Sequence, residues 1–199
     1  MLQLRHLVVV AVLAVASFAI SVPAFAQGTK LVVVDQHRVL TESAAGQDIA
    51  TKIQTIQDQM QRELEPSANS LEQLGNTIQA RTANMTPEAL QADTELQAQA
   101  RDYQTRLRTL SQESDRRATE LAITERKAQI AFAEALKPVL EEVMAAHGAE
   151  IMLAAGDVMI ALPSVNVTDE VIEKLDSRTP TIAVTRERLP AQQGQPSQQ

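Results

Sequence analysis

The sequence predicts an α+β, mainly α-helical fold in which a long antiparallel coiled-coil helical hairpin is inserted into a small β body. Apolar residues recur at spacings of three and four across residues 44–147, which is typical of two helices packed along a seam. A short β-branched segment at residues 31–34 and a short apolar segment at residues 151–154, both typical of strands, flank this region. Only 2% of the residues are aromatic, too few for a deep core in one chain. We therefore expect an oligomer that pools its strands.

The first 26 residues match a secretory signal peptide. Arg5 is followed by an apolar run over residues 7–20 and by a small-residue motif at residues 24–26, so we expect cleavage after Ala26. An uncleaved anchor is the alternative, but roughly 14 apolar residues fall short of the ~20 that span a bilayer. Cleavage leaves 17 basic against 25 acidic residues, a formal charge of about −8. This acidic balance argues against nucleic acid as a partner.

Residues 27–43 and 148–176 are expected to form the small α+β body. Residues 151–154 and 158–162 indicate a β-hairpin, because a short connection containing Gly joins two apolar runs. Thr168 is expected to cap a short helix with an apolar face. The residues predicted to lie in the shared core of the oligomer are Leu31, Val33, Ile151, Leu153, Val158 and Ile160.

The predicted hairpin occupies residues 44–147, with its tip near residues 85–88. Thr86 can cap a new helix whose first residue is Pro87, and Gly148 suits the left-handed position that closes the second arm. Pro66 predicts a kink in the first arm and a hinge in its middle third, although a bend without functional consequence is nearly as plausible. The second-arm residues assigned to the apolar seam are Leu107, Leu110, Leu121, Ala128, Ala131 and Ala135, and the polar residues assigned to seam positions are Ser114, Arg117 and Thr124.

Two groups of arm residues have both a binding and a structural interpretation. The seam thins near the tip, so Ile78, Met85 and Leu90 are the candidates for a diffuse apolar binding surface, while the remaining stripe is the seam itself. The second arm also carries five arginines at positions 101, 106, 108, 116 and 117. They form either a patch for an acidic client or lipid headgroup, or a solvated face paired with neighbours three or four residues away, which we favour.

Residues 177–199 are rich in Pro and Gln and predict a disordered tail, with an edge strand at residues 181–184 as the less favoured alternative. The residues offer little for catalysis. The chain has no cysteine, and His37 and His147 have no companion at metal-ligand spacing. We expect no enzyme, no metal and no cofactor.

The order of these elements resembles the Skp/OmpH family of periplasmic chaperones for outer-membrane proteins. The resemblance covers Thr29 to about Asp176 and rests on the signal peptide and on Leu31-Val32-Val33-Val34-Asp35, Arg38-Val39-Leu40, Ser43-Ala44-Ala45-Gly46 and the segment from Ile151 to Leu162. It implies a jellyfish-shaped homotrimer in which three tentacles enclose a cavity. There, an unfolded outer-membrane β-barrel protein would be held without ATP. Members of the family are markedly basic and this chain is acidic, so binding to a membrane surface or lipopolysaccharide does not carry over to named residues.

The sequence leaves two classes of function. The first is an ATP-independent periplasmic holdase that prevents unfolded outer-membrane protein precursors from aggregating. The alternative is a structural coiled-coil adaptor of the cell envelope, which would need a rigid rod with a defined register. The poor seam favours the holdase.

Overall fold

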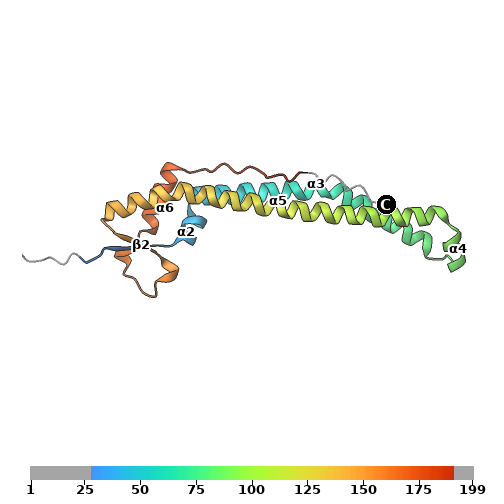
Figure 1. Cartoon of the computed structure of the whole chain (residues 1–199), viewed down its shortest axis with the longest axis horizontal. Coiled ribbons are helices and arrows are strands. Elements are labelled where there is room, and N and C mark those ends of the chain that lie inside the picture. Colours follow the sequence, from blue (N-terminus) through green and yellow to red (C-terminus); the bar gives the residue numbers. More distant parts are fainter. Residues whose placement is uncertain (1–27, 191–199) are drawn as a thin grey trace, which may run out of the picture. The chain divides into compact units, whose positions relative to one another are not determined.

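The computed structural model describes residues 28–190 of the 199-residue chain. The predicted signal peptide, its cleavage position after Ala26 and residues 191–199 of the predicted tail lie outside the described residues. Residues 31–190 belong to one compact unit. Its helices and strands are β1 (Leu31–Val34), α2 (Gln36–Glu42), α3 (Ala44–Thr82), α4 (Pro87–Ala92), α5 (Thr94–His147), β2 (Ile151–Ala154) and α6 (Thr168–Arg178) (Figure 1). The α+β, mainly α-helical fold class is confirmed.

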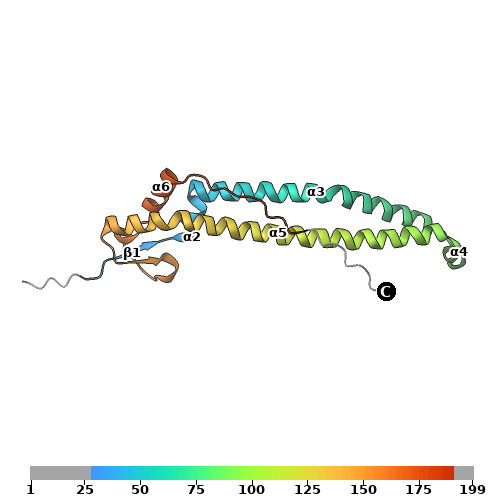
Figure 2. The same ribbon diagram turned by 45° about the horizontal axis from the view of Figure 1, so that its top comes forward.

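The two long helices α3 and α5 lie side by side and run in opposite directions, because the chain turns back at α4 (Figure 2). Ser43 caps α3 by accepting a hydrogen bond from the Gly46 amide at 3.2 Å. Gly148 ends α5 with φ 57°, which confirms the predicted left-handed cap. The helix α3 continues through Pro66, so the predicted kink does not interrupt it.

The turn between the long helices contains two caps rather than one. Thr86 caps α4 and Pro87 is its first residue, as predicted. The second arm does not continue from there, because Asp93 starts a new helix by accepting a hydrogen bond from the Leu96 amide at 2.9 Å. The same carboxylate pairs with Arg81 of α3 at 2.9 Å, which joins the end of one arm to the start of the other.

The sheet has two parallel strands within the described residues. β1 and β2 pair with Leu31 opposite Ile151 and Val34 opposite Ala154. The predicted second strand of a β-hairpin at residues 158–162 is wrong: a 3₁₀ turn over residues 155–157 is followed by irregular chain. The strand β2 pairs with β1 instead of with residues 158–162. The backbone oxygen of Val33 in β1 accepts a hydrogen bond from the Val167 amide at 2.9 Å.

Helix α6 closes the body over the start of the hairpin. The predicted cap by Thr168 is wrong, because its hydroxyl accepts a hydrogen bond from the Asp35 amide at 2.9 Å and bonds Asn166 Oδ1 at 2.6 Å. Thr168 therefore ties the end of β1 to the start of α6. The fully buried apolar side chains of this body are Val34, Val39, Ala45, Val139, Val143, Val171 and Leu175.

Replacing Gly46 by Ala is expected to destabilise the body. A Cβ there would collide with the backbone carbonyl oxygen of Leu40 and lie 2.7 Å from its carbonyl carbon, so the packing of α2 on α3 has to shift. We expect a loss of about 1–3 kcal/mol in the free energy of unfolding, measured by urea titration. Gly156→Ala is the matched control, since its Cβ would meet nothing within 4 Å. Equal stability of the two variants would contradict the prediction.

The segment 179–190, which we call the strap, is extended chain without helix or strand and lies along α3 and α5 (Figures 1 and 2). The predictions of a disordered tail over residues 177–190 and of an edge strand at 181–184 are therefore wrong. Helix α6 continues to Arg178, and side chains of α3 and α5 then accept hydrogen bonds from the strap's amides. These acceptors give the backbone partners that a strand would otherwise supply.

Candidate assembly and client-binding surfaces

One face of the two-stranded sheet is apolar and open to solvent. Side chains alternate along a strand, so Val32 and Val34 point into the core while Leu31 and Val33 point to the opposite face. On that outer face Leu31 is 44% exposed and Leu153 is 37% exposed. Val33 is buried, because the segment leading into α6 pairs with it.

The irregular segment after β2 adds further exposed apolar side chains. Met159 is fully exposed and Ile160 is 90% exposed, whereas Val158 is half-buried. Leu162 is also exposed. Large apolar side chains gathered in this way on one body are typical of a protein–protein contact surface.

The three residues predicted to contact a client lie on successive segments at the far end of the hairpin. Ile78 belongs to α3, Met85 to the connection after it, and Leu90 to α4. Each side chain is half-buried. Their thioether and aliphatic groups are therefore partly accessible without forming an open patch.

The buried row on α5 coincides with the predicted seam at Thr124 and Ala128 and is displaced from it by one residue at Glu120, Phe132 and Leu136. Leu121, Ala131 and Ala135 are half-buried and Leu107 is 48% exposed. The buried side chains of α5 are Leu96, Glu120, Thr124, Ala128, Phe132, Leu136, Val139 and Val143. Ser114 is exposed, so leucine at this position would not extend the seam.

Glu120 is a fully buried carboxylate in this row, and the apolar periodicity did not predict it. Its Oε2 lies 3.2 Å from Arg117 Nη1 and 3.4 Å from Arg186 Nη2, and its Oε1 lies 3.9 Å from Arg116 Nη1. Arg186 also binds Glu63 of α3, with Nη1 2.7 Å from Oε1. A buried charge persists when it is paired and hydrogen-bonded in this way. The sequence does contain a feature that could have indicated this buried carboxylate: Glu120 lies four residues before Thr124 and shortly after Arg116 and Arg117.

The arginines of α5 are largely engaged with acids of the same protein. Arg106 pairs with Asp102 at 2.8 Å, Arg116 with Glu113 at 2.6 Å, and Arg117 with Glu63 at 3.3 Å. This arrangement supports the paired-face interpretation over an unpaired patch for acidic ligands.

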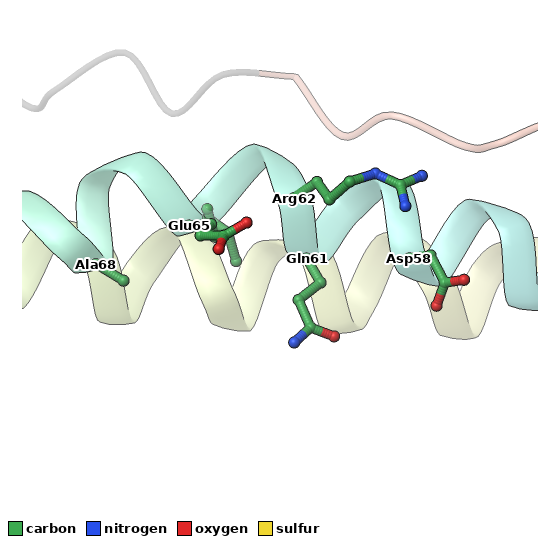
Figure 3. Close-up of a pocket in the computed structure, with 6 residues that line it drawn as sticks. Asp58, Gln61, Arg62, Glu65 and Ala68 are labelled. Atoms are coloured by element: carbon green, nitrogen blue, oxygen red, sulfur yellow. The ribbon is translucent and has the colours of Figure 1, made fainter.

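A hollow of about 430 Å³ on α3 carries no convergent chemistry. Its labelled side chains come from a single helix, and Gln61 and Arg62 point away from each other (Figure 3). Among residues 28–190, no group of three or more His, Asp or Glu side chains could hold a metal ion. No helix in the described part of the chain combines the length and apolar character needed to cross a bilayer.

Comparison with known proteins decides the family. Residues 30–175 match the model of the family described as outer membrane protein (OmpH-like). The chain belongs to the OmpH-like family. A crystal structure of a candidate OmpH-like outer membrane chaperone from Caulobacter crescentus CB15 is similar, with a TM-score of 0.70 and 25% identity over 82% of this chain and 94% of that chain. No match was found among curated protein sequences.

The OmpH-like match ends at residue 175, so the strap lies outside the matched region. Its attachment depends on three carboxylates. A hydrogen bond from Lys52 and one from the Ile182 amide lower the pKa of Asp48, and Arg186 lowers the pKa of Glu63. Burial alone raises the pKa of Glu120. Hydrogen bonds from the Leu189 amide, Arg117 and Arg186 outweigh burial and hold that pKa below its ordinary value.

The strap of this OmpH-like protein is expected to detach as the pH falls. The three lowered pKa values mean that attachment favours ionised carboxylates. The attached strap is therefore fully stabilised when the pH is above the ordinary pKa values of 3.8 for Asp and 4.5 for Glu. This stabilisation is lost as the pH falls through the lower pKa values of the folded state. The chain has no cysteine, so Thr185→Cys gives a unique spin-label site whose mobility should rise over this range. A label at Gln104→Cys, on an exposed position of α5, is the control. Equal pH responses at both sites would contradict the prediction.

Proposed function

We propose that this OmpH-like protein is an ATP-independent periplasmic holdase that binds unfolded outer-membrane protein precursors and prevents their aggregation. It works as a homotrimer whose small bodies pool their strands. The paired helices α3 and α5 of each copy form a coiled-coil tentacle, and the three tentacles enclose the client. Signal-peptide cleavage after Ala26 delivers the chain to the periplasm.

The observation that carries the proposal is the apolar outer face of the sheet, together with the exposed side chains of residues 159–162. The helices of the body cover the inner face of this two-stranded sheet, but the exposed side chains of its outer face lack partners among the described residues. Copies of the same surface around one axis supply them, since homo-oligomers use closed symmetry. Family membership supports the client class, because the similar crystal structure is of a candidate outer membrane chaperone.

The hairpin supports binding rather than chemistry. Its distal half carries few buried side chains, among them Leu71 and Leu96, so the arms expose long, adaptable surfaces of mixed polarity. Ile78, Met85 and Leu90 contribute client contacts at the far end, where partly accessible aliphatic groups adapt to different partners. Many weak contacts of this kind suit a client without fixed structure.

The test is an aggregation assay without nucleotide. A urea-unfolded outer-membrane β-barrel protein is diluted into buffer with and without the chaperone, and light scattering is followed. We expect scattering to be suppressed, with a client dissociation constant between nanomolar and micromolar, about −12 to −8 kcal/mol. If the client aggregates equally in both samples, the holdase proposal fails and the coiled-coil adaptor of the cell envelope becomes the better explanation.

A further inference from the structure

The strap is held through its backbone by side chains of α3 and α5. The hydrogen bonds run from Ile182 N to Asp48 Oδ2 (2.9 Å), from Lys52 Nζ to Ile182 O (2.7 Å), from Glu187 N to Thr124 Oγ1 (3.0 Å) and from Leu189 N to Glu120 Oε1 (3.0 Å). Backbone atoms are common to every polypeptide, so these four contacts do not depend on the strap's own sequence.

Side chains of the strap add selectivity. Ile182 and Arg186 are its two anchors, Val184 packs against the apolar cluster, and Glu187 pairs with Lys127 of α5 at 2.8 Å. Ile182 is 6% exposed and belongs to the apolar cluster of the body. Four residues later, the guanidinium of Arg186 binds Glu63 with two hydrogen bonds of 2.7 and 3.0 Å and reaches Glu120 at 3.4 Å. Ala183 and Thr185 between them are exposed. An apolar residue followed four positions later by arginine is the pattern that this surface accepts.

We propose that this surface, the strap groove, is a binding site for extended segments of unfolded polypeptide, and that the strap is its intramolecular occupant. The strap groove consists of Asp48, Lys52, Glu63, Glu120 and Thr124. It takes segments in which an apolar residue precedes an arginine by four positions. The inference rests on the holdase function proposed above and adds a defined site and a peptide class to it.

The charge of the groove requires a cationic occupant. The cluster contains Glu63, Glu113 and Glu120 against Arg116 and Arg117, so removal of Arg186 leaves one uncompensated negative charge beside the fully buried Glu120. A guanidinium satisfies two carboxylates at once through its planar fork, which an ammonium group does not.

Two features make the strap replaceable. The Nε atom of Arg186 is buried and has no hydrogen-bond partner among the described residues, so the strap is an imperfect ligand for its own groove. A hollow of about 800 Å³ lies beside Leu189 and Pro190 and is lined by α5 residues between Thr109 and Thr119. A bound segment that passes the Leu189 contact would meet this part of α5.

The experiment frees the groove in the full chain and offers it a peptide. The double variant Ile182→Ala with Arg186→Ala removes both strap anchors, and a fluorescent peptide with the sequence of residues 179–190 is the probe. Fluorescence anisotropy should show binding to the double variant about tenfold tighter than to the wild type, whose own strap competes. A peptide with alanine at both anchor positions should not bind. Thr185→Ala, at an exposed strap position between the two anchors, should behave as the wild type.

Competition by client completes the test. When urea-unfolded outer-membrane protein is diluted into the mixture, it should displace the bound peptide from the double variant. Failure of the peptide to bind a variant with an unchanged circular dichroism spectrum overturns the proposal, as does binding that the client does not displace. If the double variant is unfolded, Arg186→Ala alone is used, with the same outcomes expected. Suppression of client aggregation by the wild type is measured separately. A failure of the groove proposal can therefore be distinguished from a failure of the holdase proposal.

Discussion

Replacing Leu153 by Asp is expected to convert the assembled protein into folded monomers. Leu153 is 37% exposed on the outer face of β2, so one chain tolerates a carboxylate there. In a trimer that pools its sheets the same carboxylate is buried without a partner, which costs several kcal/mol per copy. Light scattering coupled to gel filtration should report the mass of one chain, with helical circular dichroism retained.

The matched control is Leu107→Asp, which places the same charge on a 48% exposed position of α5, away from the body. It should keep the mass of the wild type. Ile160→Asp is a second test of the pooled surface, because Ile160 is 90% exposed in the single chain. Val33 is unsuitable, since its side chain is buried and a charge there would unfold the monomer. A wild-type mass for both Leu153→Asp and Ile160→Asp would refute assembly through this face.

Replacing Glu120 by Ala is expected to lower the free energy of unfolding by about 3 kcal/mol, because it leaves buried arginine donors without their shared acceptor. Arg117 and Arg186 both bind this carboxylate, and the Leu189 amide loses its acceptor as well. Urea unfolding at a fixed chain concentration gives the value, since the stability of an oligomer depends on concentration.

Glu125→Ala is the control for this experiment, because it removes an exposed glutamate from the same helix. Its effect should stay within about 0.5 kcal/mol of zero. Hydrogen exchange supplies a second measurement: the amides of Glu187 and Leu189 should exchange faster in Glu120→Ala. If Glu120→Ala and Glu125→Ala lower the free energy of unfolding equally, the buried cluster does not hold the strap in place.

Local patterns predicted the helices well and the strand partners poorly. Caps at Thr86 and Gly148 could be recognised because each depends on residues within one turn of the chain. The segment 158–162 has the composition of a strand but no neighbouring strand in the single chain to receive it. On α5, apolar residues occupy neighbouring positions, so the periodicity identified Ala128 correctly but assigned Ala131 to the seam where the structure buries Phe132.

The strap and the buried cluster depend on contacts that no local pattern contains. The Pro- and Gln-rich composition of the tail indicates disorder, yet the strap's amides bind acceptors more than sixty residues away along the chain. Thr124 was interpreted as a weak point of the seam. The structure gives its hydroxyl a partner, the Glu187 amide, so replacing Thr124 by Leu would remove a strap contact.

The parallel pairing of β1 with β2 also determines the order in which the chain can fold. Leu31 pairs with Ile151, so the sheet closes a loop of 120 residues. The arms close through nearer neighbours around α4, and the entropy lost on closing a loop rises with its length. During synthesis β1 emerges first, with its partner strand absent until nearly the whole hairpin has been made. The arms therefore form early, the body forms last, and the outer face of the sheet is complete only after synthesis has passed residue 154.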